Sequence, residues 1–430
     1  MVIAIKDAPQ HVGEEVELRG WSYNVRSSGK IMFLQLRDGT GRIQGVLVKN
    51  DVSEEKWTEA KTLTVESSVI VRGEVRADDR SATGVELTVK DVEVVSVAAE
   101  YPIGKKEHGP DFLLDHRHLW IRSERQAAIL RVRDEIEFAF REYMKEQGFV
   151  LADSPVFTPS ACEGTTDLFE VKYFDDKAYL SQSGQLYQEA TSAALGKTYC
   201  FGPTFRSEKS KTRRHLTEFW MLEAEASYMD WEENLRVQEG LVVHTVKRVL
   251  DRCQAELKFL ERDLKSLEKT AEGGFPRVTF DEAVAKLKEL GSDIQDGEDF
   301  GADDETMLTK EYDTPIFVTK YPKDVKAFYM KPDPENPNLV LCDDMLAPEG
   351  YGEIIGGSQR IDDLELLEER IAEHKLPQEA FEWFLDIRRY GSVPHSGFGI
   401  GLERTVTWIC GTEHVREAIP FPRLLNRISP

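Results

Sequence analysis

The chain has 430 residues, of which 40% are hydrophobic and 31% charged, and it carries a net charge of −23. This length predicts two or three domains, and the composition is typical of a soluble globular protein. The acidic balance excludes nucleic-acid binding through an overall positive field, so any RNA partner must meet local basic and aromatic patches.

The apolar segments and the cysteines predict the cellular compartment of the protein. No stretch of 18 apolar residues exists, which excludes a membrane-spanning helix and predicts no membrane partner. The N-terminal residues turn acidic too early for a signal peptide. The cysteines are odd in number, far apart and never in a Cys-x-x-Cys pair: Cys162, Cys200, Cys253, Cys342 and Cys410. They predict neither a zinc site nor a disulfide framework, and we expect a cytoplasmic protein.

Residues 1–100 predict a small β-barrel. Turn signals such as residues 38–41 separate short alternating or apolar segments, with one helix-like stretch at 52–63. The five predicted strands are 16–21, 31–36, 42–48, 68–75 and 85–95. The oligonucleotide-binding (OB) barrel is the leading candidate for this pattern, and residues 101–122, which begin with prolines, glycines and charges, are predicted to be a linker.

Residues 123–430 predict a larger domain of mixed structure. The predicted helices are 123–147, 231–255, 280–290, 364–374, 378–389 and one from Gly401 onward. The predicted strands are 150–157, 177–181, 198–206, 218–225, 316–319, 327–330 and 351–356. Strands interleaved with helices without regular βαβ spacing favour the α+β class with an antiparallel sheet flanked by helices. Residues of about 256–315 form a variable insertion region whose role the sequence does not define.

A cationic loop lies between two of these strands. Six basic residues occupy ten positions: Arg206, Lys209, Lys211, Arg213, Arg214 and His215. A generic loop of this kind is usually a solvated hairpin tip. Two features favour a binding site instead: Arg206 and Glu208 are expected to share one strand face, and Phe219 offers an aromatic face on which a base can stack. Guanidinium groups match phosphate and carboxylate oxygens bidentately.

A glycine run precedes the last helix. Gly397, Gly399 and Gly401 alternate and are followed at once by Glu403 and Arg404. Glycines allow a ligand close to the backbone, and an arginine at a helix start can reach phosphate. The dinucleotide-binding fingerprint is excluded because its strand–helix spacing is missing.

In chain order, the helix–strand unit ending at residues 148–159, the cationic loop and the glycine run resemble the signature motifs of class II aminoacyl-tRNA synthetases. The barrel, the linker and the segment 201–206 are similar to the subclass that charges Asp, Asn and Lys. The resemblance covers essentially the whole chain.

The resemblance implies an ATP site and its residue roles. Arg206 would bridge the α-phosphate of ATP and the amino-acid carboxylate, and Arg404 would reach the γ-phosphate. Glu353 matches the carboxylate that binds Mg²⁺ and counts with these two arginines as catalytic. The remaining residues implied in ATP binding are Glu208 for the adenine amino group, Phe219 for stacking, Arg214 and His215 for the distal phosphates, and Gly401.

The resemblance also implies the amino-acid pocket. Its residues are Glu163, Ser183, Gln185, Gln188, Arg206, Glu223 and Arg360. Aspartyl members of the family carry a lysine where Gln188 stands, and burying an acidic substrate beside Glu223 without that cation is costly. The pocket therefore resembles the asparaginyl branch, with L-asparagine, ATP and tRNA(Asn) as expected partners.

In the barrel, Arg26, Phe33 and Gln44 match the positions that hold the tRNA anticodon in relatives. The long helix and the strand after it, with Pro155, match the family's dimer interface, so we expect a homodimer. Three alternatives stay open: an aspartyl-tRNA synthetase, including one with relaxed tRNA specificity; a synthetase-like enzyme that makes asparagine, whose relatives lack the barrel; and a non-catalytic RNA-binding protein.

Overall fold

The computed structural model describes residues 1–81, 83–104, 106–159 and 168–430, and it divides into two compact units, Met1–Leu114 and Asp115–Pro430. The second unit begins inside the segment predicted to be a linker. Two short helices lie there, α2 (Pro110–Asp115) and α3 (Arg117–Trp120). Arg117 is buried and donates through Nε to the carbonyl of Pro420 at 2.8 Å, which ties α3 to the end of the chain.

The first unit is a closed barrel with strand order β1-β2-β3-β5-β4. Its strands are β1 (Glu15–Ser28), β2 (Ile31–Arg37), β3 (Arg42–Val48), β4 (Ser68–Ala77) and β5 (Val85–Ser96). Every second side chain of these strands points into a core that helix α1 (Glu54–Ala60) covers with the buried Trp57. All five predicted strands and the predicted helix are confirmed.

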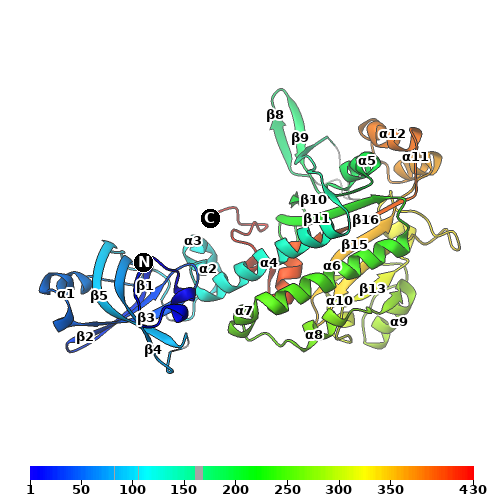
Figure 1. The fold of residues 1–430 in the computed structure, drawn as a ribbon. Helices are drawn as coiled ribbons and strands as arrows, with labels where there is room; N and C mark the ends of the chain where they lie inside the picture. The colour runs from blue at the N-terminus through cyan, green and yellow to red at the C-terminus, as the bar shows by residue number, and fades with distance from the viewer. Residues whose placement is uncertain (82, 105, 160–167) are drawn as a thin grey trace. The chain divides into compact units, whose positions relative to one another are not determined.

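The second unit is built on an eight-stranded sheet (Figure 1). In sheet order its strands are β12 (Arg277–Thr279), β13 (Ile316–Thr319), β14 (Cys342–Ala347), β15 (Gly352–Gln359), β16 (His395–Gly401), β11 (Glu218–Ser227), β10 (Lys197–Phe205) and β6 (Val150–Leu151). Only the outermost pairs, β12 with β13 and β10 with β6, are parallel. The predicted α+β class with an antiparallel sheet is therefore confirmed.

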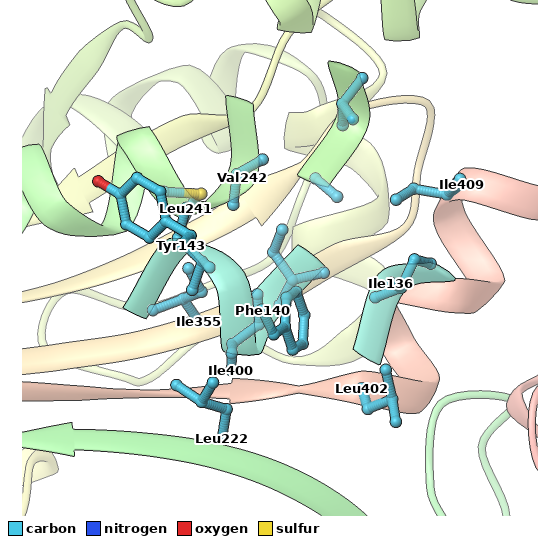
Figure 2. Packing of buried hydrophobic residues seen from close by; sticks show 14 of the residues in the cluster. Ile136, Phe140, Tyr143, Leu222, Leu241, Val242, Ile355, Ile400, Leu402 and Ile409 are labelled. Atoms are coloured by element: carbon cyan, nitrogen blue, oxygen red, sulfur yellow. The ribbon is translucent and has the colours of Figure 1, made fainter. Parts of the chain in front are cut away.

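One face of this sheet is covered by α4 (Glu124–Glu146), α6 (Trp231–Arg252) and α13 (Leu402–Cys410). Figure 2 shows the packing: Phe140 of α4 and Leu241 of α6 lie against Leu222, Ile355 and Ile400 from three adjacent strands. Leu222 and Ile355 are both paired with Ile400. Because side chains alternate along a strand, the residues next to these three point to the opposite face, which is where the functional candidates lie.

The remaining elements surround the sheet. The helices are α5 (Gln185–Leu195), α7 (Gln254–Phe259), α8 (Lys265–Glu272), α9 (Phe280–Glu289), α10 (Ala302–Thr309), α11 (Leu364–Glu373) and α12 (Glu382–Arg389). A second, three-stranded sheet contains β7 (Phe157–Thr158), β9 (Asp176–Leu180) and β8 (Glu170–Tyr173). Across the described ranges, no helix has both the length and the apolar character needed to cross a bilayer.

Two predicted strands are wrong. Residues 328–329 form a turn, in which the consecutive side chains of Phe328 and Tyr329 are both buried, whereas a strand would send them to opposite faces. Met330 makes only an isolated bridge to Arg360. Residues 150–157 form two separate short strands, β6 and β7, in different sheets, and Pro155 lies between them, where it cannot donate to a ladder. Helix α5 and strand β14 were not predicted.

Candidate active site

The open face of the eight-stranded sheet holds a cavity of about 610 Å³, within the range of small-molecule sites. Twelve of the residues predicted from sequence line it: Ser183, Gln185, Arg206, Glu208, Arg214, His215, Phe219, Glu223, Glu353, Arg360, Gly401 and Arg404. Glu163 lies outside the described residues. The cavity has an arginine end, around Arg206 and Arg404, and a glutamate end, around Glu223 and Arg360.

The glycines of β16 make room for this cavity. A Cβ atom at Gly399 would lie 2.6 Å from the Cε atom of Met221, and one at Gly397 would overlap the Glu225 carboxylate. Gly399, which is paired with Glu223, lines the cavity, whereas the place of a side chain at Gly397 is filled by the Glu225 carboxylate. The glycine run thus lies in strand β16, which is followed directly by α13.

The arginine end is organised by the first turn of α13. Glu403 points inward, where it accepts from Arg133 Nη1 at 2.7 Å and from the backbone N–H of Trp220 at 2.9 Å. Arg404, the next residue, faces the cavity and donates through Nη1 to the Glu353 carboxylate at 2.9 Å. Burial raises the pKa of Glu353, but Arg404, Lys326 and Arg206 outweigh that effect and lower its pKa overall. This carboxylate is therefore ionised beside three cations.

Arg206 and Phe219 face each other across the β10–β11 hairpin. The guanidinium carbon of Arg206 lies 5.5 Å from the centroid of the Phe219 ring. The prediction that Arg206 and Glu208 share a strand face is wrong, because β10 ends at Phe205, yet both side chains line the cavity. Burial, followed by repulsion from Arg404 and Arg206, lowers the pKa of His215, so the neutral imidazole is favoured.

Two carboxylates at this end form a pair that suits a hard cation. Glu353 Oε2 is bonded to Arg404, and Asp344 Oδ2 accepts from Lys326 Nζ at 2.7 Å. The other oxygen of each carboxylate lies over Gly356, where a Cβ atom would be 3.4 Å from Glu353 Oε1 and 3.6 Å from Asp344 Oδ1. Burial, opposed by Lys326 but reinforced by Glu353, raises the pKa of Asp344 to about 6. Two such oxygens fit the ligand preference of Mg²⁺. Sequence reasoning missed Asp344, although two adjacent acids in an apolar strand are an unusual signal.

At the glutamate end, Glu223 is held by the segment before α5. Its Oε1 accepts from the Ser183 hydroxyl, and its Oε2 accepts from the backbone N–H of Gly184 at 2.8 Å. The Glu223 side chain is buried, and Gln185 and Arg360 line the same cavity. The glutamate end thus combines the fixed acceptor Glu223 with the polar side chains of Gln185 and Arg360.

A buried ionic network lies behind Gln185 and Arg360. Arg360 donates to Glu225 through Nε at 3.1 Å and through Nη2 at 3.0 Å, so its charge is compensated. Gln185 donates through Nε2 to Glu189 Oε1 at 3.1 Å, and Arg388 Nη2 donates to Glu189 Oε2 at 2.6 Å. Burial raises the pKa of Glu189, but Arg388 and His395 outweigh it and lower that pKa overall.

Gln188 corrects one prediction. Its side chain is buried on α5, and its amide donates to the carbonyl of Ala152 at 2.6 Å and to Ser154 Oγ at 2.9 Å. It is not among the residues that line the cavity. In this structure Gln188 fastens α5 to the chain after β6 instead of pointing to a substrate.

In the barrel, the three predicted anticodon residues lie on neighbouring strands. Arg26 of β1 is paired directly with Phe33 of β2, and Gln44 of β3 is paired with Gln35, two positions along β2 from Phe33. Residues two apart on a strand share a face of the sheet, so Phe33 and Gln35 project to the same side. Directly paired residues also share a face, so Arg26 and Gln44 project to that side too. Arg26, Phe33 and Gln44 thus form one mixed aromatic and polar surface.

Fold and site together define a class II aminoacyl-tRNA synthetase. The family model for class II tRNA synthetases (D, K and N) matches residues 109–425, and an OB-fold nucleic acid binding domain matches residues 16–95. The chain belongs to the class II tRNA synthetase family of the D, K and N type.

Its relatives are more specific. The chain is 58% identical, over 100% of its own length and 99% of the relative's, to an asparagine–tRNA ligase of Pelotomaculum thermopropionicum. It is 59% identical to the asparagine–tRNA ligase of Symbiobacterium thermophilum over 100% of its length and 99% of the relative's. Among solved structures it is similar to the asparaginyl-tRNA synthetase of Pyrococcus horikoshii in complex with asparaginyl-adenylate, with a TM-score of 0.97, 47% identity and coverage of 100% and 99% of the two chains.

Proposed function

We propose that the protein activates L-asparagine with ATP and transfers it to tRNA(Asn). The observation that carries this proposal is the charge balance at the glutamate end. Arg360 is compensated by Glu225, and Glu223 adds a further negative charge. A neutral carboxamide can donate a hydrogen bond to the Glu223 carboxylate, whereas the second carboxylate of aspartate would be buried beside a group of the same charge, which is costly.

Activation needs positioning more than acid–base chemistry. The asparagine carboxylate attacks the α-phosphorus of ATP, and pyrophosphate leaves with the electrons of the broken P–O bond. The nucleophile is already an anion, so no protein base is required. Arg206 would hold the α-phosphate and the attacking carboxylate together, and Arg404 would hold the γ-phosphate in place of its contact with Glu353.

The other cavity residues would recognise the two substrates. Phe219 would stack on the adenine while Glu208 accepts from its amino group, and Gly401 would allow close approach of the nucleotide. His215 and Arg214 border the path of the distal phosphates. Ser183, Gln185, Glu223 and Arg360 would orient asparagine.

Glu353 and Asp344 are the residues that would hold Mg²⁺, because each keeps an oxygen directed over Gly356. When bound, Mg²⁺ neutralises charge on the phosphate oxygens. The ion pairs of these carboxylates with Arg404 and Lys326 keep both oxygens oriented for that purpose.

The adenylate would then pass its acyl group to the terminal ribose of tRNA, whose anticodon is held by Arg26, Phe33 and Gln44. A splayed anticodon suits an aromatic and polar surface of this kind. We also propose a homodimer, because β6 is the edge of the large sheet and exposes Val150 and Leu151, while α4 exposes Phe138. The described cysteines are buried and unpaired, which suits a reducing cytoplasm.

The decisive experiment is ATP–pyrophosphate exchange driven by asparagine or by aspartate. We expect asparagine to drive exchange with a kcat/KM roughly 100-fold or more above that of aspartate, because a site built to hydrogen-bond one substrate group rejects a mismatched group more strongly than a hydrophobic pocket does. Preferential activation of aspartate would overturn the proposal in favour of an aspartyl enzyme. No exchange with either amino acid would favour a non-catalytic protein.

A further inference from the structure

Helix α10 carries a carboxylate that joins two segments of the arginine end. Glu305 is largely buried, with its side chain 15% exposed. Its Oε2 accepts from Arg214 Nη1 at 2.7 Å and from the backbone N–H of Glu353 at 2.9 Å. These partners are 91 and 48 residues away in the chain. One oxygen thus fastens both the loop before β11 and the start of β15 to the same helix.

Arg214 is held by further contacts around this carboxylate. Its Nη2 donates to the carbonyl of Gly350 at 2.7 Å and to the hydroxyl of Thr306, the residue after Glu305. Both terminal nitrogens of the guanidinium are therefore engaged by α10 and by the turn before β15. In this arrangement Arg214 anchors the loop whose next residue, His215, lines the cavity.

Gly352 is shaped to this junction. Its φ is +78°, a conformation that favours glycine, and a Cβ atom there would overlap both Glu305 Oε2 and Arg214 Nη1. The close approach of β15 to the ion pair therefore depends on a glycine immediately before Glu353.

Building on the proposed function, we propose that Glu305 is a positioning residue for ATP activation: it fixes Arg214 and the backbone of Glu353 so that the loop and the metal-binding carboxylate face the triphosphate together. Glu305 does not line the cavity, so its effect passes through these two partners.

The test is Glu305→Gln, which keeps the shape and removes the charge. We expect the KM for ATP in pyrophosphate exchange to rise roughly ten- to a hundred-fold, the worth of a hydrogen bond between charged groups, while the KM for asparagine is unchanged. Glu305→Asp, which restores the charge, should recover part of the loss. The matched control is Asp281→Asn, an equal loss of charge at an exposed position in the first turn of helix α9, for which we expect wild-type values.

Three results would overturn the inference: Glu305→Gln with the same ATP KM as Asp281→Asn, a parallel rise of both KM values, or no recovery in Glu305→Asp. If Glu305→Gln does not fold, Thr306→Val takes its place, because it removes the hydroxyl that accepts a hydrogen bond from Arg214. A smaller rise confined to the KM for ATP would support the inference. An unchanged KM for ATP would refute it. Failure of the wild-type enzyme to catalyse asparagine-dependent exchange would instead refute the proposed function, so the two failures are distinguishable.

Discussion

The two ends of the cavity use ion pairs in different ways. At the glutamate end, the side chains of Arg388 and Glu189 are both 0% exposed. At the arginine end, the side chains of Arg404 and Glu353 remain 25% and 36% exposed. A buried pair is costly to break, whereas a solvated pair exchanges partners at little cost. Under the proposed function, this difference means that the glutamate end would select a small neutral group with fixed polar atoms, while the arginine end would release its arginine to an incoming polyphosphate.

The largest effect that tests this difference between the two ends is expected for Glu189→Gln. This variant leaves Arg388 without its buried counter-charge and disturbs the Glu189 contact that orients Gln185. We expect a loss of about 3–5 kcal/mol in the free energy of unfolding, measured by urea denaturation.

A surface pair provides the control for Glu189→Gln. Glu368 and Arg389 are 3.4 Å apart, and their side chains are partly exposed. Glu368→Gln should cost at most about 1 kcal/mol. Equal losses in the two variants would mean that burial does not distinguish the glutamate end.

The complementary change at the arginine end is Arg404→Ala. We expect this variant to lose roughly 2.7–4 kcal/mol of transition-state stabilisation, the scale of one lost oxyanion-hole donor, and thus to abolish detectable pyrophosphate exchange. Its free energy of unfolding should stay close to that of the wild type because the Arg404–Glu353 pair is partly solvated. Binding of tRNA, measured by filter retention, should be largely intact. Unchanged exchange would refute the role of Arg404.

The features that could be predicted from the sequence are those that local signals specify. The barrel strands follow from alternation, which is a local property, and each of the five strands predicted in the barrel overlaps an observed one. Arg206, Phe219 and Arg404 were found because dense charge and glycine runs are local signals. Glu305 was missed because its partner Arg214 is 91 residues away, and acids in the first turn of a helix such as α10 ordinarily indicate only a helix start.

Gln188 shows the opposite failure. Its position matches a substrate-binding lysine in aspartyl relatives, but a resemblance specifies a position and not the direction of a side chain. Here the amide is turned to Ala152 and Ser154. Side-chain direction depends on which partners the fold supplies, and those contacts are not visible in the sequence.

The smallest expected effect lies outside the cavity, in the barrel. Phe33→Ala removes an aromatic face opposite Arg26 and should leave pyrophosphate exchange unchanged, because activation takes place in the other unit. Stacking of one base is worth about 1–3 kcal/mol, so kcat/KM for tRNA charging should fall roughly 5- to 150-fold. The control is Val95→Ala, an exposed apolar residue of β5, which should charge tRNA normally. A Phe33 variant with normal charging would show that the mixed surface does not hold the anticodon. A Phe33 variant that also lost pyrophosphate exchange would show that the barrel affects amino-acid activation in the other unit.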